Sequence, residues 1–174
     1  EGRREASNEE LLISAYRATQ YASSIRRRAT WDELTSTGAL GLIADQRLRD
    51  VAALVYNSES QQEARTEGLN SRYRAAFRMI APVAVQATLE DQCGDRYTAP
   101  GDYGAMKNQL NYACKTGLAA EMIDEVAGAL RNDVELARLL RLRAADVRTL
   151  IGNLTTSNED VINGLRALTE ERAS

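Results

Sequence analysis

The chain has 174 residues, of which 44% are hydrophobic, and a formal net charge of −3 at pH 7. This size suits one domain with its own core, so we expect a single domain over 1–174. The acidic balance argues against general nucleic-acid binding, which usually needs a clustered basic face. Because only 5% of residues are aromatic and helix-favouring residues abound, the composition predicts an all-α fold.

The N-terminal sequence suggests a piece of a longer, exported protein. No run of about eighteen or more apolar residues occurs, so no part of the sequence predicts a transmembrane span. The chain begins at Glu1, and its polar opening EGRREASNEE resembles a segment that follows a removed anchor or signal. The alternative is a cytosolic protein that was trimmed.

The first helix is predicted to begin after Ser7, because Ser7 and Glu10 have the spacing of a capping box. Small and aliphatic residues then recur every three or four positions, which predicts a narrow seam that a neighbouring helix can approach closely. The residues of this seam are Leu11, Ala15, Ala18, Ala22 and Ile25.

Residues 30–50, TWDELTSTGALGLIADQRLRD, predict a corner between two helices. Thr30 and Glu33 have capping-box spacing and can start a short helix, which Gly38 can end in the left-handed conformation. Asp45 is expected to cap the next helix. We expect apolar side chains to fill the turn and Trp31 to close the end of a helical bundle. The structural residues of the corner are Trp31, Leu34, Gly38, Leu42, Ile43, Asp45 and Leu48.

Helical periodicity continues over 45–91, although 57–68 is almost wholly polar. One helix and two helices both fit this pattern, and we favour one because Gly68 is the only breaker in the polar stretch. Pro82 is expected to kink this helix. The predicted seam beyond the polar stretch is Leu69, Tyr73, Ala76, Ile80, Val83 and Ala87.

Two cysteines, Cys93 and Cys114, bracket the longest irregular stretch of the chain. A disulfide closing about twenty residues contributes roughly 3 kcal/mol in the chain-entropy model, which would hold this loop in place. Such a bond requires an oxidising compartment and so predicts a periplasmic location. The alternative is two unrelated buried thiols. With no His and no CxxC spacing, the pair does not predict a metal site.

The C-terminal part predicts a short helix over 116–132 and a long terminal helix that Asn132 is expected to cap. Together with the preceding elements, these predict an antiparallel bundle of about four main helices, with a short corner helix and one disulfide-tied loop. The terminal helix has a near-heptad apolar rhythm. Its members are Leu136, Leu140, Val147, Leu150, Leu154, Val161, Leu165 and Leu168.

Catalytic chemistry finds little support in the sequence. The absence of His excludes Ser-His-Asp and Cys-His nucleophile systems, His metal sites and the Glu-x-x-His di-iron pattern of bundles. Phosphate-binding glycine loops are absent as well. Adjacent carboxylates such as Glu90 and Asp91 are explained by the charged faces of amphipathic helices. We therefore expect no enzymatic activity, no cofactor and no metal.

Arginine supplies nearly all of the 22 basic residues. Its planar fork suits carboxylates and phosphates, so the cluster of Arg72, Arg74 and Arg78 is a candidate site for an anionic small ligand between helices. We favour the alternative that such residues pair with Glu on neighbouring turns and keep a helical surface solvated. A second cluster is Arg138, Arg141, Arg143 and Arg148.

The corner carries a recurring pattern: an aromatic residue, Glu-Leu, a small pair, Gly, Leu-x-Leu-Ile, an acidic residue, Leu-Arg and a following Tyr. The matching residues are Trp31, Glu33, Leu34, Ser36, Gly38, Leu40, Leu42, Ile43, Asp45, Leu48, Arg49 and Tyr56. Over roughly its first third, the chain thereby resembles a group of bacterial single-pass membrane proteins of unknown function. The resemblance implies a short N-terminal transmembrane helix, a charged juxtamembrane segment and a helical domain outside the cytoplasm. It implies no catalytic residue.

Two functions from different classes follow. The first is a periplasmic interaction or scaffolding module, tethered to the inner membrane by a missing N-terminal segment, that contacts a protein partner or another copy of itself through a helix face or the disulfide-tied loop. The second is a sensory domain that binds a small anionic ligand and passes a helix shift to a membrane segment. A sensor needs membrane helices leading into a signalling domain, and nothing apolar follows TEERAS. We therefore favour the first.

Overall fold

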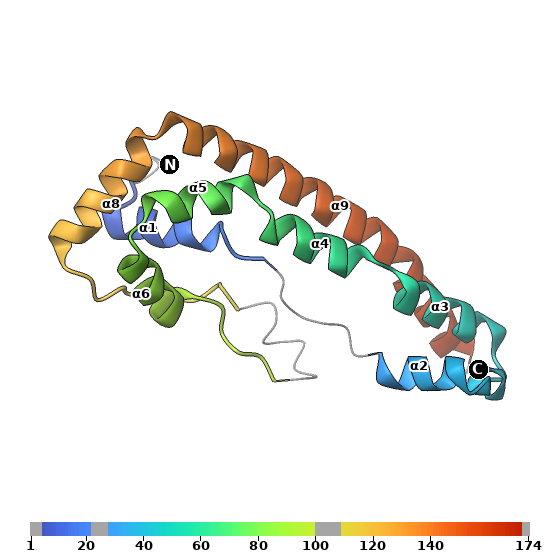
Figure 1. Cartoon of the computed structure of the whole chain (residues 1–174). Helices are drawn as coiled ribbons and strands as arrows, with labels where there is room; N and C mark the ends of the chain where they lie inside the picture. The colour runs from blue at the N-terminus through green and yellow to red at the C-terminus, as the bar shows by residue number, and fades with distance from the viewer. Residues whose placement is uncertain (1–4, 22–27, 100–108, 172–174) are drawn as a thin grey trace. The chain divides into compact units, whose positions relative to one another are not determined.

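The computed structural model describes residues 5–21, 28–99 and 109–171, and over these residues the chain is all-α, as predicted, with no strand (Figure 1). The elements are α1 (Asn8–Arg17), α2 (Ala29–Ser36), the 3₁₀ turn η1 (Ala39–Leu42), α3 (Gln46–Asn57), α4 (Ser60–Leu69), α5 (Arg72–Ile80), α6 (Val83–Cys93), α8 (Ala120–Asn132) and α9 (Val134–Glu171).

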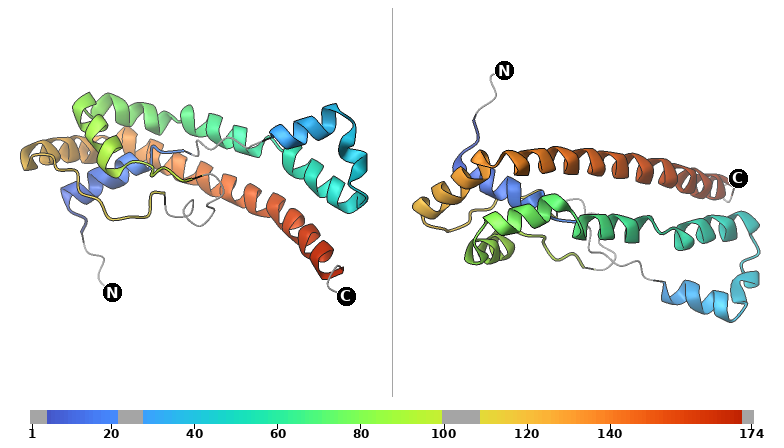
Figure 2. Two further views of the ribbon diagram at one scale, coloured as in Figure 1. Left: turned by 90° about the horizontal axis from the view of Figure 1, so that it is seen from below. Right: turned by 45° about the horizontal axis from the view of Figure 1, so that its top comes forward.

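The chain forms two compact units. Unit 1 comprises Glu1–Tyr21 and Glu67–Ala145, and unit 2 comprises Ala22–Thr66 and Asp146–Ser174. Two helices, α4 and α9, contribute residues to both units. Figure 2 shows α9 as one continuous helix, which agrees with the long terminal helix that the sequence predicts.

Unit 1 is a helical bundle in which α1 packs against α6 and α8, and α5 packs against α8. The rings of Tyr16 and Phe77 meet in its centre, with their centroids 6.3 Å apart and tilted. This packing buries one connected apolar core. Its main members are Leu12, Ile13, Tyr16, Tyr73, Phe77, Val85, Leu89, Val126, Leu130, Leu136 and Leu139.

Helix α1 begins with the predicted capping box, because Glu10 N donates to Ser7 Oγ at 3.2 Å and Ser7 N donates to Glu10 Oε2 at 2.8 Å. It ends at Arg17, earlier than its seam predicts. The hydroxyl of Tyr73 donates to the carbonyl of Ala15 at 3.0 Å and so satisfies one of the last carbonyls of the helix. Burial raises the pKa of Tyr73 to about 12. The predicted seam members Ala22 and Ile25 lie outside the described residues.

The prediction of one helix over 45–91 is wrong, because α3, α4, α5 and α6 occupy this range. Ser58 is extended and ends α3. Ser71 starts α5 by accepting a hydrogen bond from Arg74 N, since a serine oxygen competes with the helical hydrogen-bond pattern. Pro82 ends the helix rather than kinking it. It disfavours the helical conformation for the residue before it, and Ala81 is accordingly extended, with ψ 128°.

These breaks also change which side chains are buried. The predicted seam members Leu69 and Val83 are exposed. From Tyr73 onward the buried residues follow a spacing of four, which continues across the break at Ala81 and leads to the first cysteine. They are Tyr73, Phe77, Ala81, Val85, Leu89 and Cys93.

In unit 2, the corner is built around the rings of Trp31 and Tyr56, which stack with their centroids 5.1 Å apart and their planes 10° apart. Trp31 is buried, while Leu34 is only half-buried. The short helix begins at Ala29 instead of after Thr30, and its N-cap Arg28 makes no side-chain capping bond. Gly38, at φ 71°, ends it in the left-handed conformation.

The turn beyond Gly38 packs differently from the expectation. Because η1 has three residues per turn, Leu40 and Ile43 share one half-buried side, whereas Leu42 is 84% exposed and makes no part of the apolar filling. Asp45 Oδ1 accepts a hydrogen bond from Leu48 N at 3.2 Å and caps α3. The Leu48 side chain is half-buried.

Helix α9 is capped by Asp133 rather than by Asn132, since Asp133 Oδ1 accepts from Leu136 N at 2.7 Å. The buried face of its first part contains Leu139 and Arg143 instead of the predicted Leu140, which is exposed. In its second part, Gly164 lets α9 approach α3, because a Cβ at this position would lie 2.8 Å from Val51 Cγ2. The side chains of residues 165 and 168 lie outside the description.

Candidate functional site

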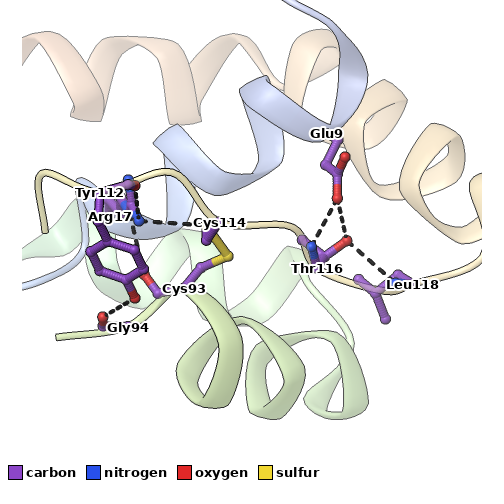
Figure 3. The surroundings of a disulfide bond; sticks show 8 residues. All are labelled: Glu9, Arg17, Cys93, Gly94, Tyr112, Cys114, Thr116 and Leu118. Carbon is purple, nitrogen blue, oxygen red and sulfur yellow. Dashed lines mark hydrogen bonds between the residues drawn. A yellow bond between two sulfur atoms is a disulfide. The ribbon is translucent and has the colours of Figure 1, made fainter. Parts of the chain in front are cut away.

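The predicted disulfide is confirmed: Cys93 and Cys114 are bonded, with their Cα atoms 5.6 Å apart and 21 positions apart in the chain (Figure 3). Cys93 is the last residue of α6 and is fully buried, because it occupies the final position of the spacing-four seam. The bond therefore anchors the irregular segment directly to the core of unit 1.

Arg17, the last residue of α1, contacts both chain segments that the disulfide joins. Its Nε donates to the carbonyl of Cys93 at 3.2 Å, and its Nη2 donates to the carbonyl of Tyr112 at 3.0 Å and lies 3.4 Å from Cys114 Sγ (Figure 3). One guanidinium thus holds the backbone on both sides of the disulfide. This role was not predicted from the sequence, where its only local signal is a cation in the last turn of a helix.

The two arms that leave the disulfide, 94–98 and 109–113, form what we call the stem. The hydroxyl of Tyr112 donates to the carbonyl of Gly94 at 2.6 Å, and Arg96 N donates to the carbonyl of Gln109 at 3.2 Å. Further out, Gln109 Nε2 donates to Thr98 Oγ1 at 2.9 Å. These bonds join the arms at successive levels, so the stem is held at its base and along its length.

The stem carries two exposed side chains that suit contacts with another protein, those of Arg96 and Tyr97. The guanidinium carbon of Arg96 lies 3.5 Å from the ring centroid of Tyr112, and that of Arg17 lies 4.6 Å from the same ring. Arg96 is exposed, and among the described residues no carboxylate lies within ion-pair distance of it. Tyr97 is 88% exposed. A guanidinium that lies over an aromatic ring can still donate its N–H groups to a carboxylate in a bidentate contact.

Glu9 in α1 binds the segment that follows Cys114. Its Oε1 accepts hydrogen bonds from the backbone N and the hydroxyl of Thr116, each at 2.8 Å (Figure 3). These two bonds, the backbone one foremost, hold the pKa of Glu9 below its ordinary value. Leu118 N in turn donates to Thr116 Oγ1 at 3.3 Å. These bonds hold residues 116–118 against α1, and we call the arrangement the Glu9 clamp.

The arginines of the predicted anion site have different neighbours. Arg74 donates to the carbonyl of Thr19 at 3.2 Å and lies over the ring of Tyr21, 5.0 Å from its centroid. Its partial burial lowers the pKa of its guanidinium, and the nearby charge of Arg78 lowers it further. Arg72 instead lies 3.9 Å from Glu135 and is largely exposed. Arg74 and Arg78 are therefore neighbours, while Arg72 contacts a different element.

The arginines of the second cluster also lie in different surroundings. Arg143 is only 9% exposed, contrary to a solvated face, and its Nη1 lies 3.3 Å from Glu67 Oε1. Its Nη2 donates to the carbonyl of Gln20 at 3.5 Å. By contrast, Arg138 makes an exposed pair with Glu135 at 3.7 Å, which is the solvated arrangement we favoured.

The described part of unit 1 has hollows of two different kinds on its surface. One, of about 650 Å³, is open and mixed in character, and lies between α6 and the segment after Cys114. The other, of about 440 Å³, is mainly apolar and lies between α5 and the beginning of α9. Within the described ranges, no three His, Cys, Asp or Glu side chains are placed to hold a metal ion. None of the helices described there is both long and apolar enough to span a bilayer.

No protein-family model, no curated protein and no solved structure matches the chain.

Proposed function

We propose that this protein is a non-enzymatic interaction module that acts outside the cytoplasm and binds a protein partner through the stem beside the Cys93–Cys114 disulfide. The observation that carries this proposal is the exposure of Arg96 and Tyr97 on a stem whose backbone is braced by the disulfide, by Arg17 and by its own cross-arm hydrogen bonds.

The chemistry of the stem suits a protein contact. Tyr and Arg, together with Trp, are the residue types enriched at interaction hot spots. A site that is already ordered before binding loses less conformational entropy on association. Among the described residues, no carboxylate forms an ion pair with Arg96. A carboxylate of the partner is therefore the contact that its guanidinium fits best.

The proposed location rests on two supports. The disulfide is compatible with an oxidising compartment such as the periplasm. The resemblance of the corner to extracytoplasmic domains of single-pass membrane proteins suggests a tether to the inner membrane upstream of this chain. Alkylation of free thiols in intact cells tests the compartment, since the cysteines of the proposed exported form resist alkylation until a reductant is added.

A photo-crosslinking experiment tests the interaction. p-Benzoylphenylalanine is placed at Tyr97, and separately at the equally exposed Leu42 of unit 2 as a control, in cells that make the protein natively. We expect an adduct from position 97 that is absent from position 42. The adduct should disappear with Arg96→Ala and with the double substitution Cys93→Ala and Cys114→Ala. Identical products from both positions, or an adduct that survives Arg96→Ala, would contradict the proposal.

A further inference from the structure

An apolar groove of about 440 Å³ lies between α5 and the beginning of α9, on a surface different from the stem. Its apolar lining is Ala75, Ala76, Met79, Ile80, Leu136 and Leu139. Met79 is 82% exposed, although it lines an apolar hollow. A large exposed apolar residue beside such a hollow is typical of an interaction surface, because leaving both in water is unfavourable.

The rim of the groove carries both signs of charge. Arg72 and Glu135 both line it, and their closest N and O atoms are 3.9 Å apart. Their side chains stay 72% and 58% exposed, and Glu135 also lies 3.7 Å from Arg138, so both charged groups remain accessible within exposed pairs. Asp133 also lines the groove, but its Oδ1 is engaged in capping Leu136 N.

This combination makes the surface complementary to itself. A two-fold axis places the same patch of two copies face to face, so each feature must find its counterpart on the same surface. Here a protruding apolar side chain lies beside a hollow, and the cation Arg72 lies beside the anion Glu135, with both side chains more than half exposed. Methionine suits the protruding position, since its flexible thioether adapts to an irregular hollow.

We propose that the groove is the contact surface of a homodimer, in which Met79 of each copy enters the groove of the partner copy. Across the two-fold axis, Arg72 of each copy pairs with Glu135 of the partner copy. The patch is small compared with standard interfaces of roughly 1,200–2,000 Å², so the dimer is weak and its dissociation constant is micromolar or higher.

Sedimentation equilibrium of the oxidised chain, over micromolar to millimolar concentrations, tests the dimer. We expect the average mass to rise towards that of two copies. Met79→Glu should weaken association by at least about tenfold, because it places a charge in the apolar contact. Leu42→Glu is the matched control, as this residue is equally exposed but lies in unit 2, and it should leave association unchanged. Circular dichroism verifies that both variants keep their helical content.

A charge exchange tests the two-fold arrangement. Arg72→Glu and Glu135→Arg should each weaken association, since each variant has like charges at both positions. Mixing equal amounts of the two variants should restore it, because both contacts of the mixed dimer then join opposite charges. A monomer at every concentration, association that survives Met79→Glu, or no recovery on mixing would each overturn the proposal. None of these outcomes depends on the stem.

Discussion

Gly68 and Tyr21 approach each other so closely that a Cβ atom added to Gly68 would lie 2.2 Å from the Cβ of Tyr21. Gly68 is in α4, and Tyr21 follows the end of α1, so this contact joins two parts of unit 1 that are far apart in the chain. Arg74 lies over the ring of the same tyrosine. The absence of a side chain at Gly68 is therefore a packing requirement, although the sequence marks it only as a helix breaker.

Gly68→Ala should destabilise the protein by about 1–3 kcal/mol, because the new methyl group forces backbone or side-chain shifts in a packed contact. Gly128→Ala in α8 is the matched control. Apart from its chain neighbours and the nearby backbone of its own helix, no atom of the described residues lies within 4 Å of its added Cβ, so it should stabilise the protein by about 0.5–1 kcal/mol through helix propensity. Urea unfolding followed by circular dichroism measures both. Shifts in the same direction would contradict the close approach to Tyr21.

Loss of the disulfide should lower the free energy of unfolding by about 2–4 kcal/mol, since the bond closes a loop between residues 21 positions apart. The double substitution Cys93→Ala and Cys114→Ala should show this loss in urea unfolding. Reductant should lower the stability of the wild type to a similar extent and leave the variant unaffected. Equal wild-type midpoints with and without reductant would show that the bond contributes nothing.

The Glu9 clamp makes stability depend on acid pH. The pKa of Glu9 in the folded state lies below its ordinary value of 4.5, because Thr116 donates two hydrogen bonds to the carboxylate. Its stabilising contribution is therefore fully present above the ordinary value and is lost as the pH falls through the folded-state pKa. Glu9→Gln should be less stable than the wild type at pH 7, and this difference should shrink below pH 4.5.

Urea midpoints at several pH values measure that difference, which isolates Glu9 from the other carboxylates. Glu5→Gln is the control, because Glu5 is exposed and lies just before the same helix. It should leave the midpoint unchanged at every pH. A constant gap between wild type and Glu9→Gln from neutral to acid pH would contradict the clamp.

Arg143→Ala should destabilise the protein by about 1–3 kcal/mol, because it removes a buried side chain and its bonds to Glu67 and the Gln20 carbonyl. The ion pair itself adds little, since Glu67 is more than a third exposed. Arg141→Ala on the same helix is the control and should change stability by no more than about 0.5 kcal/mol. Thermal unfolding of both variants measures this contrast. Similar losses would mean that Arg143 behaves as a surface residue.

Features that depend on neighbouring residues were predictable from the sequence. The Ser7–Glu10 capping box joins residues three positions apart, so its geometry follows as soon as the helix forms. The all-α class follows from composition, and the disulfide had only one possible pairing. The prediction of a single helix over 45–91 failed for a local reason as well, because Ser71 and Pro82 each start a new helix within a range that apolar periodicity alone would make continuous.

The stem and the buried arginine could not be predicted in this way. Arg17 reaches the carbonyl of Cys93 across 76 positions, and Arg143 reaches that of Gln20 across 123 positions. The sequence pattern around an arginine in a helix is the same whether its guanidinium binds water, a carboxylate or a backbone carbonyl. Its role depends on which carbonyls the fold leaves without a helical partner.

The sequence alone determined that the chain is helical, that only one disulfide pairing is possible and that helix caps form between near neighbours. The helices and their caps depend on backbone preference and on bonds within one turn. Only the tertiary structure decided which faces are buried, that Arg143 lies inside, and that Arg96 and Tyr97 remain outside on a braced stem. The reason is physical: burial depends on contacts between residues far apart in the chain, and the periodicity of a single segment does not specify those contacts.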